Sequence, residues 1–202
     1  MILFNKIDID FNSFFRKGIK KKEEPFGCFL INGYMGSGKT YLGVYLTCKF
    51  NKNLNYHVKT NIHSLNIPKM KIDYFTNLED IYNDNEEFCI YLIDELGKKY
   101  TKEAKADKDF YNFLQMSRKT KRIVMIIHQE YLQVPFWLRG VCEEVFTTKR
   151  LFFLPLFITY RGYASLDPQT LEWGVDYTFR YIYKRNKKIA SYYNTFETIC
   201  TL

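Results

Sequence analysis

The stretch Gly33-Tyr34-Met35-Gly36-Ser37-Gly38-Lys39-Thr40 matches the phosphate-binding loop pattern GxxxxGK[ST] and decides the fold of this chain. Apolar residues 28–31 before it are typical of a buried strand, and residues 41–46 after it indicate an apolar helical turn. Strand, loop and helix in this order are the context in which the pattern holds phosphate. The sequence therefore predicts an α/β fold built around this loop.

The loop contains residue types that suit a phosphate ligand. Its glycines let successive backbone N–H groups point into one concavity, and the following helix adds partial positive charge at its N-terminus. We expect Lys39 to reach the β- and γ-phosphates of ATP, and the Thr40 hydroxyl to ligate Mg²⁺. The nucleotide-binding residues predicted from the pattern are Gly33, Gly36, Ser37, Gly38, Lys39 and Thr40.

A second informative stretch is the apolar run 88–93, which ends in the acidic residues Asp94 and Glu95. Near-continuous apolar character indicates a strand buried on both faces, as in a parallel sheet covered by helices on either side. Ligands of such sheets bind beyond the carboxyl ends of the strands. We therefore expect Asp94 to hold the Mg²⁺ and Glu95 to polarise the attacking water.

A further buried strand is predicted over residues 123–127, and it ends in His128-Gln129. We expect Gln129 to sense the γ-phosphate and the attacking water, with a loop amide bonded to backbone as the alternative. Before this strand, apolar residues at helical spacing predict an amphipathic helix over 107–116, which leads into the basic run 118–122.

The rest of the chain gives weaker patterns. Strands are predicted at 57–60, 72–75, 145–148, 151–153, 157–160 and 177–183, and short helices at 76–82 and 135–140. Thr76 or Asn77 is expected to cap the helix at 76–82. Since there is no internal repeat or Gly/Ser linker, we expect one domain over 1–202. Its parts would be a lead-in over 1–26, a P-loop core over 27–150 and a β-rich extension over 151–202, with a docked aromatic tail at 192–199.

Composition limits the class of protein. The chain has 202 residues, 47% of them hydrophobic, which is enough for a substantial core, and its net charge of +8 favours a polyanionic partner. Five widely spaced cysteines without a CxxC pair indicate neither a disulfide framework nor a zinc site. The N-terminus does not have the pattern of a signal peptide, and the longest apolar run, 151–158, is too short to span a membrane. We expect a location in a host cytoplasm or in a virion.

The order of these features resembles the FtsK–HerA branch of P-loop ATPases, whose members pump DNA. The resemblance covers about residues 27–146; besides the two nucleotide motifs it includes Ser117-Arg118-Lys119, Gln129 and Leu138-Arg139-Gly140. Within the branch the chain looks most like genome-packaging ATPases of membrane-containing viruses and zonular occludens toxin-like assembly ATPases of filamentous phages. Residues 59–62 and 193–197 resemble the second group especially.

Two features depart from these families. Filamentous-phage assembly proteins carry a membrane span after the ATPase domain, and this sequence contains no such segment, which favours a packaging motor. His128 stands before Gln129 where related proteins often have a small hydroxyl residue, so the sensor assignment fits the family pattern incompletely.

The resemblance implies a three-layer RecA-like fold with a mostly parallel sheet, and hydrolysis of ATP with Mg²⁺. It implies a homo-oligomeric ring, with a hexamer expected, in which an arginine from a neighbouring subunit stabilises the transferring phosphoryl group. Arg118 is the first candidate for this arginine and Arg139 the second, although both could be ordinary surface residues. Lysines within 98–108, or the run 118–122, would contact DNA without reading its sequence. Capsid or portal-vertex proteins are further expected partners.

The leading hypothesis is therefore an ATP-driven DNA translocase that packages a viral genome into a capsid. The alternative is a phage assembly or secretion ATPase that acts on protein or membrane partners. A small-molecule kinase is disfavoured because Glu95 places a water-polarising acid where a kinase needs a hydroxyl acceptor, although Arg118 and Arg122 keep that idea open.

Overall fold

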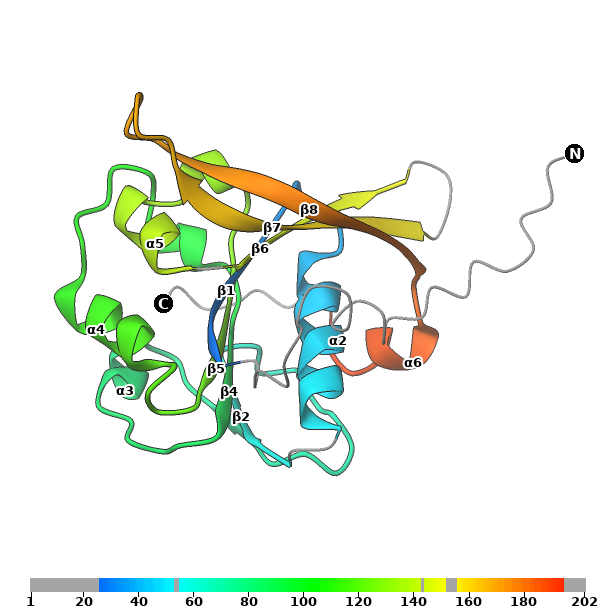
Figure 1. Cartoon of the computed structure of the whole chain (residues 1–202). Helices are drawn as coiled ribbons and strands as arrows, with labels where there is room; N and C mark the ends of the chain where they lie inside the picture. Colours follow the sequence, from blue (N-terminus) through cyan, green and yellow to red (C-terminus); the bar gives the residue numbers. More distant parts are fainter. Residues whose placement is uncertain (1–25, 53–54, 143, 152–155, 195–202) are drawn as a thin grey trace, which may run out of the picture.

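The computed structural model describes residues 26–52, 55–142, 144–151 and 156–194. Its strands form one eight-stranded sheet in the order β3-β2-β4-β5-β1-β6-β7-β8 (Figure 1). Neighbouring strands from β3 to β6 run parallel, and the last two pairs, β6 with β7 and β7 with β8, are antiparallel. The parallel strands are β1 (Gly27–Asn32), β2 (His57–Thr60), β3 (Ile72–Tyr74), β4 (Cys89–Ile93), β5 (Ile123–Ile127) and β6 (Glu144–Arg150). The hairpin consists of β7 (Leu156–Leu166) and β8 (Trp173–Lys184).

Helices cover both faces of the parallel part, which explains its continuous apolar strands. The central strands β1, β4 and β5 are buried at every position. On one face lie α2 (Lys39–Asn51) and α6 (Lys187–Ala190), and on the other lie α3 (Glu79–Tyr82), α4 (Lys108–Met116) and α5 (Phe136–Val141) (Figure 1). This three-layer arrangement confirms the predicted α/β fold class with a mostly parallel central sheet and a β-rich C-terminal part.

The topology brings three loops to one edge of the sheet. The phosphate loop follows β1, and two short 3-10 helices, η1 (Leu96–Lys98) and η2 (Tyr131–Gln133), follow β4 and β5. Because these three strands are parallel neighbours, their carboxyl ends meet at the same edge. Ligands of open α/β sheets bind at this edge, and the residues predicted to bind nucleotide lie on the loops that meet there.

Local details differ from the sequence-based expectations. The helix expected at 76–82 begins only at Glu79 and has no side-chain cap from Thr76 or Asn77. Instead, the Asp80 carboxylate accepts a hydrogen bond of 3.1 Å from the Asn77 amide, because it reaches back to N–H groups that the turn leaves unpaired. Of the strand predicted at 151–153, residue 151 lies outside any strand and the others lie outside the described residues.

The C-terminal part folds back onto the core. The β7–β8 hairpin is longer than predicted, with strands of 11 and 12 residues, because each strand supports the other along its whole length. After α6, the Asn66 amide donates to the Tyr192 carbonyl at 2.7 Å and the Asn194 amide donates to Ser64 Oγ at 2.9 Å. The described part of the tail is therefore docked beside the loop after β2, and the remainder of the predicted tail lies outside the described residues. Every helix among the described residues is too short or too polar to span a lipid bilayer.

Candidate nucleotide-binding site

The phosphate loop is enclosed by the C-terminal strands, and two of its glycines are sterically required. A Cβ on Gly33 would lie 2.4 Å from the Thr148 carbonyl oxygen, and a Cβ on Gly38 would lie 2.6 Å from the Phe157 ring. Gly38 also adopts a left-handed conformation, with φ of +89°, immediately before the first residue of α2. The loop conformation thus depends on close packing against β6 and β7 as well as on the pattern itself.

Lys39 and Thr40 begin α2 and point toward the acidic end of β4. The Lys39 ammonium donates to the Tyr34 carbonyl at 3.1 Å, and the Thr40 hydroxyl donates to Asp94 Oδ2 at 2.7 Å. Burial lowers the pKa of Lys39, and the nearby Asp94 and Glu95 carboxylates oppose this shift. An anionic ligand at this position would compensate the Lys39 ammonium for the hydration that it loses on burial.

The fit of these groups to Mg²⁺ can be judged from the donor atoms. A hydroxyl and a carboxylate oxygen, the hard ligands that Mg²⁺ accepts, already converge in the Thr40–Asp94 pair. Asp94 is 4% exposed, and burial raises its pKa to about 6 even though it accepts hydrogen bonds from Thr40 and from the Glu95 amide. A buried carboxylate of this kind is stabilised by a cation, so the two residues fit the ion.

Asn61 fixes the end of β4, and its role was not predicted from the sequence. Its side-chain amide donates to the Asp94 carbonyl, and its side-chain oxygen accepts from the Asp94 amide, both at 2.8 Å. Asn61 is 2% exposed, so both bonds are shielded from water. An asparagine directly after a short strand was the available sequence signal, because such a strand ends at the same edge as β4.

Glu95 turns the chain away from the strand. It adopts a left-handed conformation with φ of +55°, its amide donates to Asp94 Oδ1 at 2.7 Å, and its carboxylate pairs with Lys98. This conformation is costly for a residue with a side chain and is frequent at functional sites. It places the half-exposed Glu95 side chain on the wall of a pocket that Lys39 and Thr40 also line.

The pocket has a volume of about 500 Å³ and joins residues from both parts of the sheet. The residues that were predicted from the sequence and line it are Gly36, Gly38, Lys39, Thr40, Asp94, Glu95 and Gln129. The C-terminal part adds Arg150, Phe157, Arg185 and Tyr193, which the sequence analysis missed because their approach depends on pairing between distant strands. Phe157 also stacks on Tyr41 at a ring separation of 5.6 Å, so the aromatic wall is fixed to α2.

Gln129 and its neighbour His128 have different environments. Gln129 is exposed and lines the pocket, and its carbonyl accepts from the Gly33 amide at 2.6 Å. His128 is 3% exposed, and one ring nitrogen lies 3.2 Å from the Tyr100 carbonyl. Burial lowers the pKa of His128, which favours a neutral ring, and this residue also lines the pocket.

A comparison with models of protein families identifies the family to which this chain belongs. The model of the Novel STAND NTPase 3 family matches residues 12–135, which is more than half of the chain and includes the phosphate loop, the acidic strand end and Gln129. This chain is a member of that family. A search of curated proteins found no match.

Solved structures of P-loop NTPases share the fold. The N-terminal domain of zonular occludens toxin from Neisseria meningitidis is 19% identical, with a TM-score of 0.59, and covers 83% of this chain and 98% of that domain. The genome packaging NTPase B204 from Sulfolobus turreted icosahedral virus 2 is 11% identical over 76% of this chain and 96% of B204, with a TM-score of 0.54. At these identities the likeness concerns the fold alone, and it confirms the predicted RecA-like P-loop class.

The predicted arginine candidates of this NTPase lie away from the pocket of their own chain. Arg118 lies beside Gly27 at the amino end of β1, whereas the phosphate loop follows the carboxyl end. Arg139 is 7% exposed and donates to the carbonyls of Val134 at 2.9 Å and Leu132 at 2.7 Å. Arg139 therefore holds the turn before α5, which makes it a poor candidate for contact with a neighbour's nucleotide.

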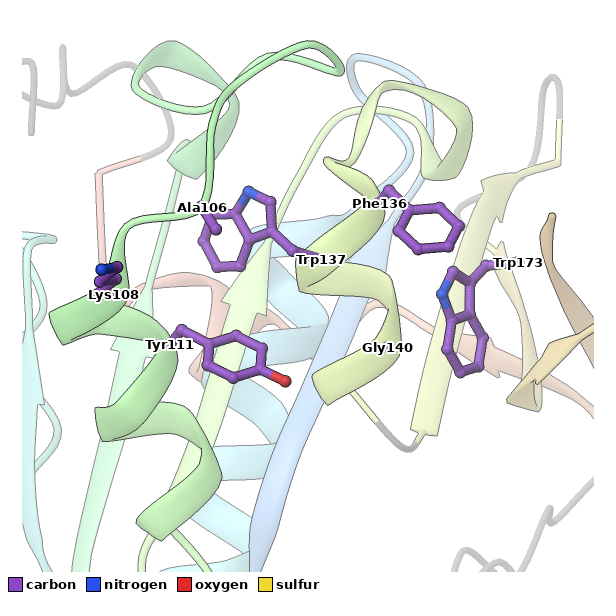
Figure 2. A pocket seen from close by; sticks show the side chains of 7 residues that line it. All are labelled: Ala106, Lys108, Tyr111, Phe136, Trp137, Gly140 and Trp173. Atoms are coloured by element: carbon purple, nitrogen blue, oxygen red, sulfur yellow. The ribbon is translucent and has the colours of Figure 1, made fainter. Parts of the chain in front are cut away.

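A second pocket of about 400 Å³ lies between α4, α5 and the start of β8. Figure 2 shows the rings of Tyr111, Phe136, Trp137 and Trp173 around it. The Trp137 indole N–H donates to the Ala104 carbonyl at 3.1 Å, and Lys108 is the one ionisable side chain of the lining besides Tyr111. This lining contains no carboxylate, histidine or cysteine, whereas the phosphate-loop pocket combines a lysine with two carboxylates, so the phosphate-loop pocket is the better candidate for a reaction.

His57, Glu86 and Cys89 form a group with donor atoms that lie within 4.8 Å of one another at the amino edge of the sheet. Lys59 Nζ already lies 2.7 Å from Glu86 Oε2, and burial raises the pKa of the Cys89 thiol to about 12. A metal ion would have to displace the lysine and ionise this thiol, so we assign no metal here.

Proposed function

We propose that this NTPase hydrolyses ATP and uses the energy to translocate DNA, as a motor that packages a viral genome into a capsid. The observation that carries the proposal is the convergence of Lys39, the Thr40–Asp94 pair and Glu95 on one pocket at the carboxyl edge of the sheet. In this arrangement a cation, an ion site and a carboxylate face the same volume. That combination suits hydrolysis of a nucleoside triphosphate.

The proposed roles follow from charge. Lys39 would neutralise charge that develops on the γ-phosphoryl oxygens, and Glu95 would orient the attacking water and receive its proton. Mg²⁺, held by Thr40 and Asp94, would supply further neutralisation of the β- and γ-phosphates. Gln129, exposed in the same pocket, would hydrogen-bond the water or the γ-phosphate.

An additional arginine would complete the site. Arg118 stays the candidate for a trans arginine, because its position outside its own pocket suits contact with the nucleotide of a neighbour in a ring. Arg150 and Arg185 line the pocket in cis and are candidates that need no neighbour. The ring, expected as a hexamer, and contacts to capsid or portal-vertex proteins belong to the same proposal.

The DNA partner is supported by the net charge of +8, since contacts to phosphate alone suffice for translocation without sequence preference. B204, which shares the fold, is a genome packaging NTPase, and its structure with ATP-gammaS shows that B204 takes an ATP analogue. An assembly or secretion ATPase that acts on protein partners is the competing function.

The deciding experiment is steady-state ATP hydrolysis with and without duplex or single-stranded DNA, at low and moderate salt. Glu95→Gln is the control variant and should bind ATP but hydrolyse it about 100-fold more slowly or worse. Stimulation by DNA that weakens with salt and is absent in the variant would support the motor. Hydrolysis that is indifferent to DNA would favour the assembly ATPase, and equal hydrolysis by Glu95→Gln would remove Glu95 from the mechanism.

A further inference from the structure

The antiparallel strands present a row of basic and aromatic side chains on one face, which we call the basic aromatic face. Its basic and aromatic residues are Lys149, Tyr160, Tyr177, Arg180 and Lys184, and Ile158 and Ile182 lie on the same side of the sheet. The strand register places them together, because Tyr160 is paired with Thr147 and Arg180, and Gly162 is paired with Tyr177. Side chains that alternate with these, such as Phe157 and Tyr181, point to the opposite face and are buried against the core.

Contacts between the side chains hold this face in a defined arrangement. Lys149 Nζ lies 5.5 Å and Arg180 Cζ 5.9 Å from the centre of the Tyr160 ring, and Tyr160 meets Tyr177 edge-on at 6.0 Å. The Tyr177 side chain is 49% exposed. Two cations are thus held beside the Tyr160 ring, and the neighbouring Tyr177 ring presents the exposed surface for stacking.

The charge of the face has one sign. Lys149, Arg180 and Lys184 are exposed, and among the described residues that β6, β7 and β8 direct to this side there is no Asp or Glu. At the other end of the hairpin the same side is closed, since Ala164 and Val175 pack into the core that α5 shares. The open part therefore combines a positive field with aromatic rings, which is the combination that binds a strand of unpaired nucleotides.

A chain of hydrogen bonds connects this face with the phosphate loop. The Tyr177 hydroxyl lies 2.7 Å from Thr147 Oγ1, and Thr147 Oγ1 donates to Asn32 Oδ1 at 3.0 Å. Since the Thr147 proton goes to Asn32, Tyr177 is the donor in the first bond. Asn32 is 2% exposed and directly precedes Gly33, the first residue of the phosphate loop.

We propose that the basic aromatic face binds a single strand of nucleic acid, and that Tyr177, Thr147 and Asn32 transmit this binding to the phosphate loop. Lys149, Arg180 and Lys184 contact backbone phosphates, and the Tyr177 ring stacks on a base. The part of the proposal that concerns binding of the strand, the binding half, depends only on the residues of the basic aromatic face. The part that concerns the effect of binding on the phosphate loop, the transmission half, rests on the proposed ATPase function.

The binding half is tested by fluorescence anisotropy with a labelled oligo(dT) of about 20 nucleotides and with a duplex of equal length, in the absence of nucleotide. The variant Lys149→Gln with Arg180→Gln should weaken oligo(dT) binding about tenfold and reduce the salt dependence by the equivalent of two phosphate contacts, a slope change of about 1.4. The matched control is Lys187→Gln with Lys188→Gln, which removes the same charge from α6, and it should change the dissociation constant less than about twofold. Thermal unfolding of both variants checks that the fold is intact.

Three outcomes of this experiment would overturn the binding half. Equal weakening by the control pair would mean that net charge alone attracts the strand. Unchanged affinity in Lys149→Gln with Arg180→Gln would exclude the face. Tighter binding of the duplex than of oligo(dT) would exclude the single strand as its ligand.

The transmission half is tested with Tyr177→Phe, which keeps the ring and removes the hydroxyl. Oligo(dT) affinity should stay within about twofold of wild type, whereas stimulation of ATP hydrolysis by oligo(dT) should fall about fivefold or more. Tyr177→Ala should in addition weaken binding about tenfold through the lost stacking. Full stimulation in Tyr177→Phe would overturn the transmission. A wild type that binds oligo(dT) without any ATP hydrolysis would overturn the transmission and the proposed function, and leave the binding half standing.

Discussion

The two edges of the parallel sheet carry similar charged residues and use them differently. At the carboxyl edge, Lys39 and Glu95 face a pocket of about 500 Å³. At the amino edge, Lys59 pairs with Asp84 and lies 2.7 Å from Glu86 Oε2, and Arg122 Nε donates to the Glu86 carbonyl at 2.9 Å. The charged groups at the carboxyl edge face a space that a ligand can occupy. Those at the amino edge are paired with one another or with the backbone.

The two lysines show the difference most clearly. Burial lowers the pKa of Lys39, and within the described part of the chain no hydrogen bond to a carboxylate offsets this loss of hydration. Burial also acts on Lys59, but its hydrogen bonds to Asp84 and Glu86 outweigh burial and raise its pKa. A charged group that lacks an internal ion pair is a functional candidate, whereas a paired one of the same type stabilises the fold.

The strongest test of this comparison is Lys39→Ala. We expect ATP turnover to fall about 1,000-fold or below detection, because the variant loses the cation that faces the phosphates. The free energy of unfolding should change by less than about 1 kcal/mol, because Lys39 forms no ion pair with the residues that the structure describes. Steady-state hydrolysis and urea unfolding measure the two quantities, and normal turnover would contradict the assignment of Lys39.

Lys59→Ala should produce the opposite result. Its removal leaves Asp84 and Glu86 without their ammonium partner at a site where Lys59 and Asp84 side chains are only 14% and 13% exposed. We expect a loss of about 2–3 kcal/mol in the free energy of unfolding, since breaking a largely buried ion pair leaves a desolvated charge. Turnover at a temperature where the variant is folded should stay within about twofold of wild type. Lys59→Ala with lost turnover and unchanged stability would remove the distinction between the edges.

Asn61→Ala should affect both properties to an intermediate extent. The substitution leaves the buried amide and carbonyl of Asp94 without their partners, at a cost of about 2 kcal/mol in stability. Because Asp94 would no longer be held in place, we expect turnover to fall about tenfold, with a higher Mg²⁺ concentration needed for half-maximal rate. A magnesium titration of hydrolysis separates this positioning role from simple destabilisation, which would leave the half-maximal concentration unchanged.

The parallel half of the fold could be predicted from the sequence because its information is local. A continuous apolar run such as 123–127, or the phosphate loop itself, indicates a buried strand or a turn without knowledge of any partner. The contacts of Gly33 with Thr148 and of Gly38 with Phe157 join residues more than 100 positions apart, and no local pattern specifies them. For this reason Arg150 and Arg185 were not predicted as pocket residues.

The same limit applies to individual charges. Nothing in the sequence around Arg139 indicated that its guanidinium would bind the carbonyls of Val134 and Leu132. Likewise, the pairing of Lys59 with Asp84 depends on how β2 lies beside β4. The sequence indicated which residues are of a type that could carry chemistry, and the structure distinguishes those that face a pocket from those that are bonded within the fold.

The smallest expected effect is the pH dependence of the stability that Glu86 contributes. Hydrogen bonds from Lys59 and His57 lower the pKa of Glu86 to about 2, so its contribution to stability is complete above the unfolded-state pKa of about 4.3 and is lost as the pH falls toward 2. Because its side chain is 43% exposed, we expect Glu86→Gln to cost no more than about 1 kcal/mol at pH 6, a change of about 2–4 °C in Tm. This difference in Tm between wild type and variant should narrow by pH 3, where the unfolded chain has already taken up the proton. A difference in Tm that stays constant between pH 6 and pH 3 would show that Glu86 contributes to stability by packing instead of charge. The ion pair between Lys59 and Glu86 would then add little to the stability of the amino edge.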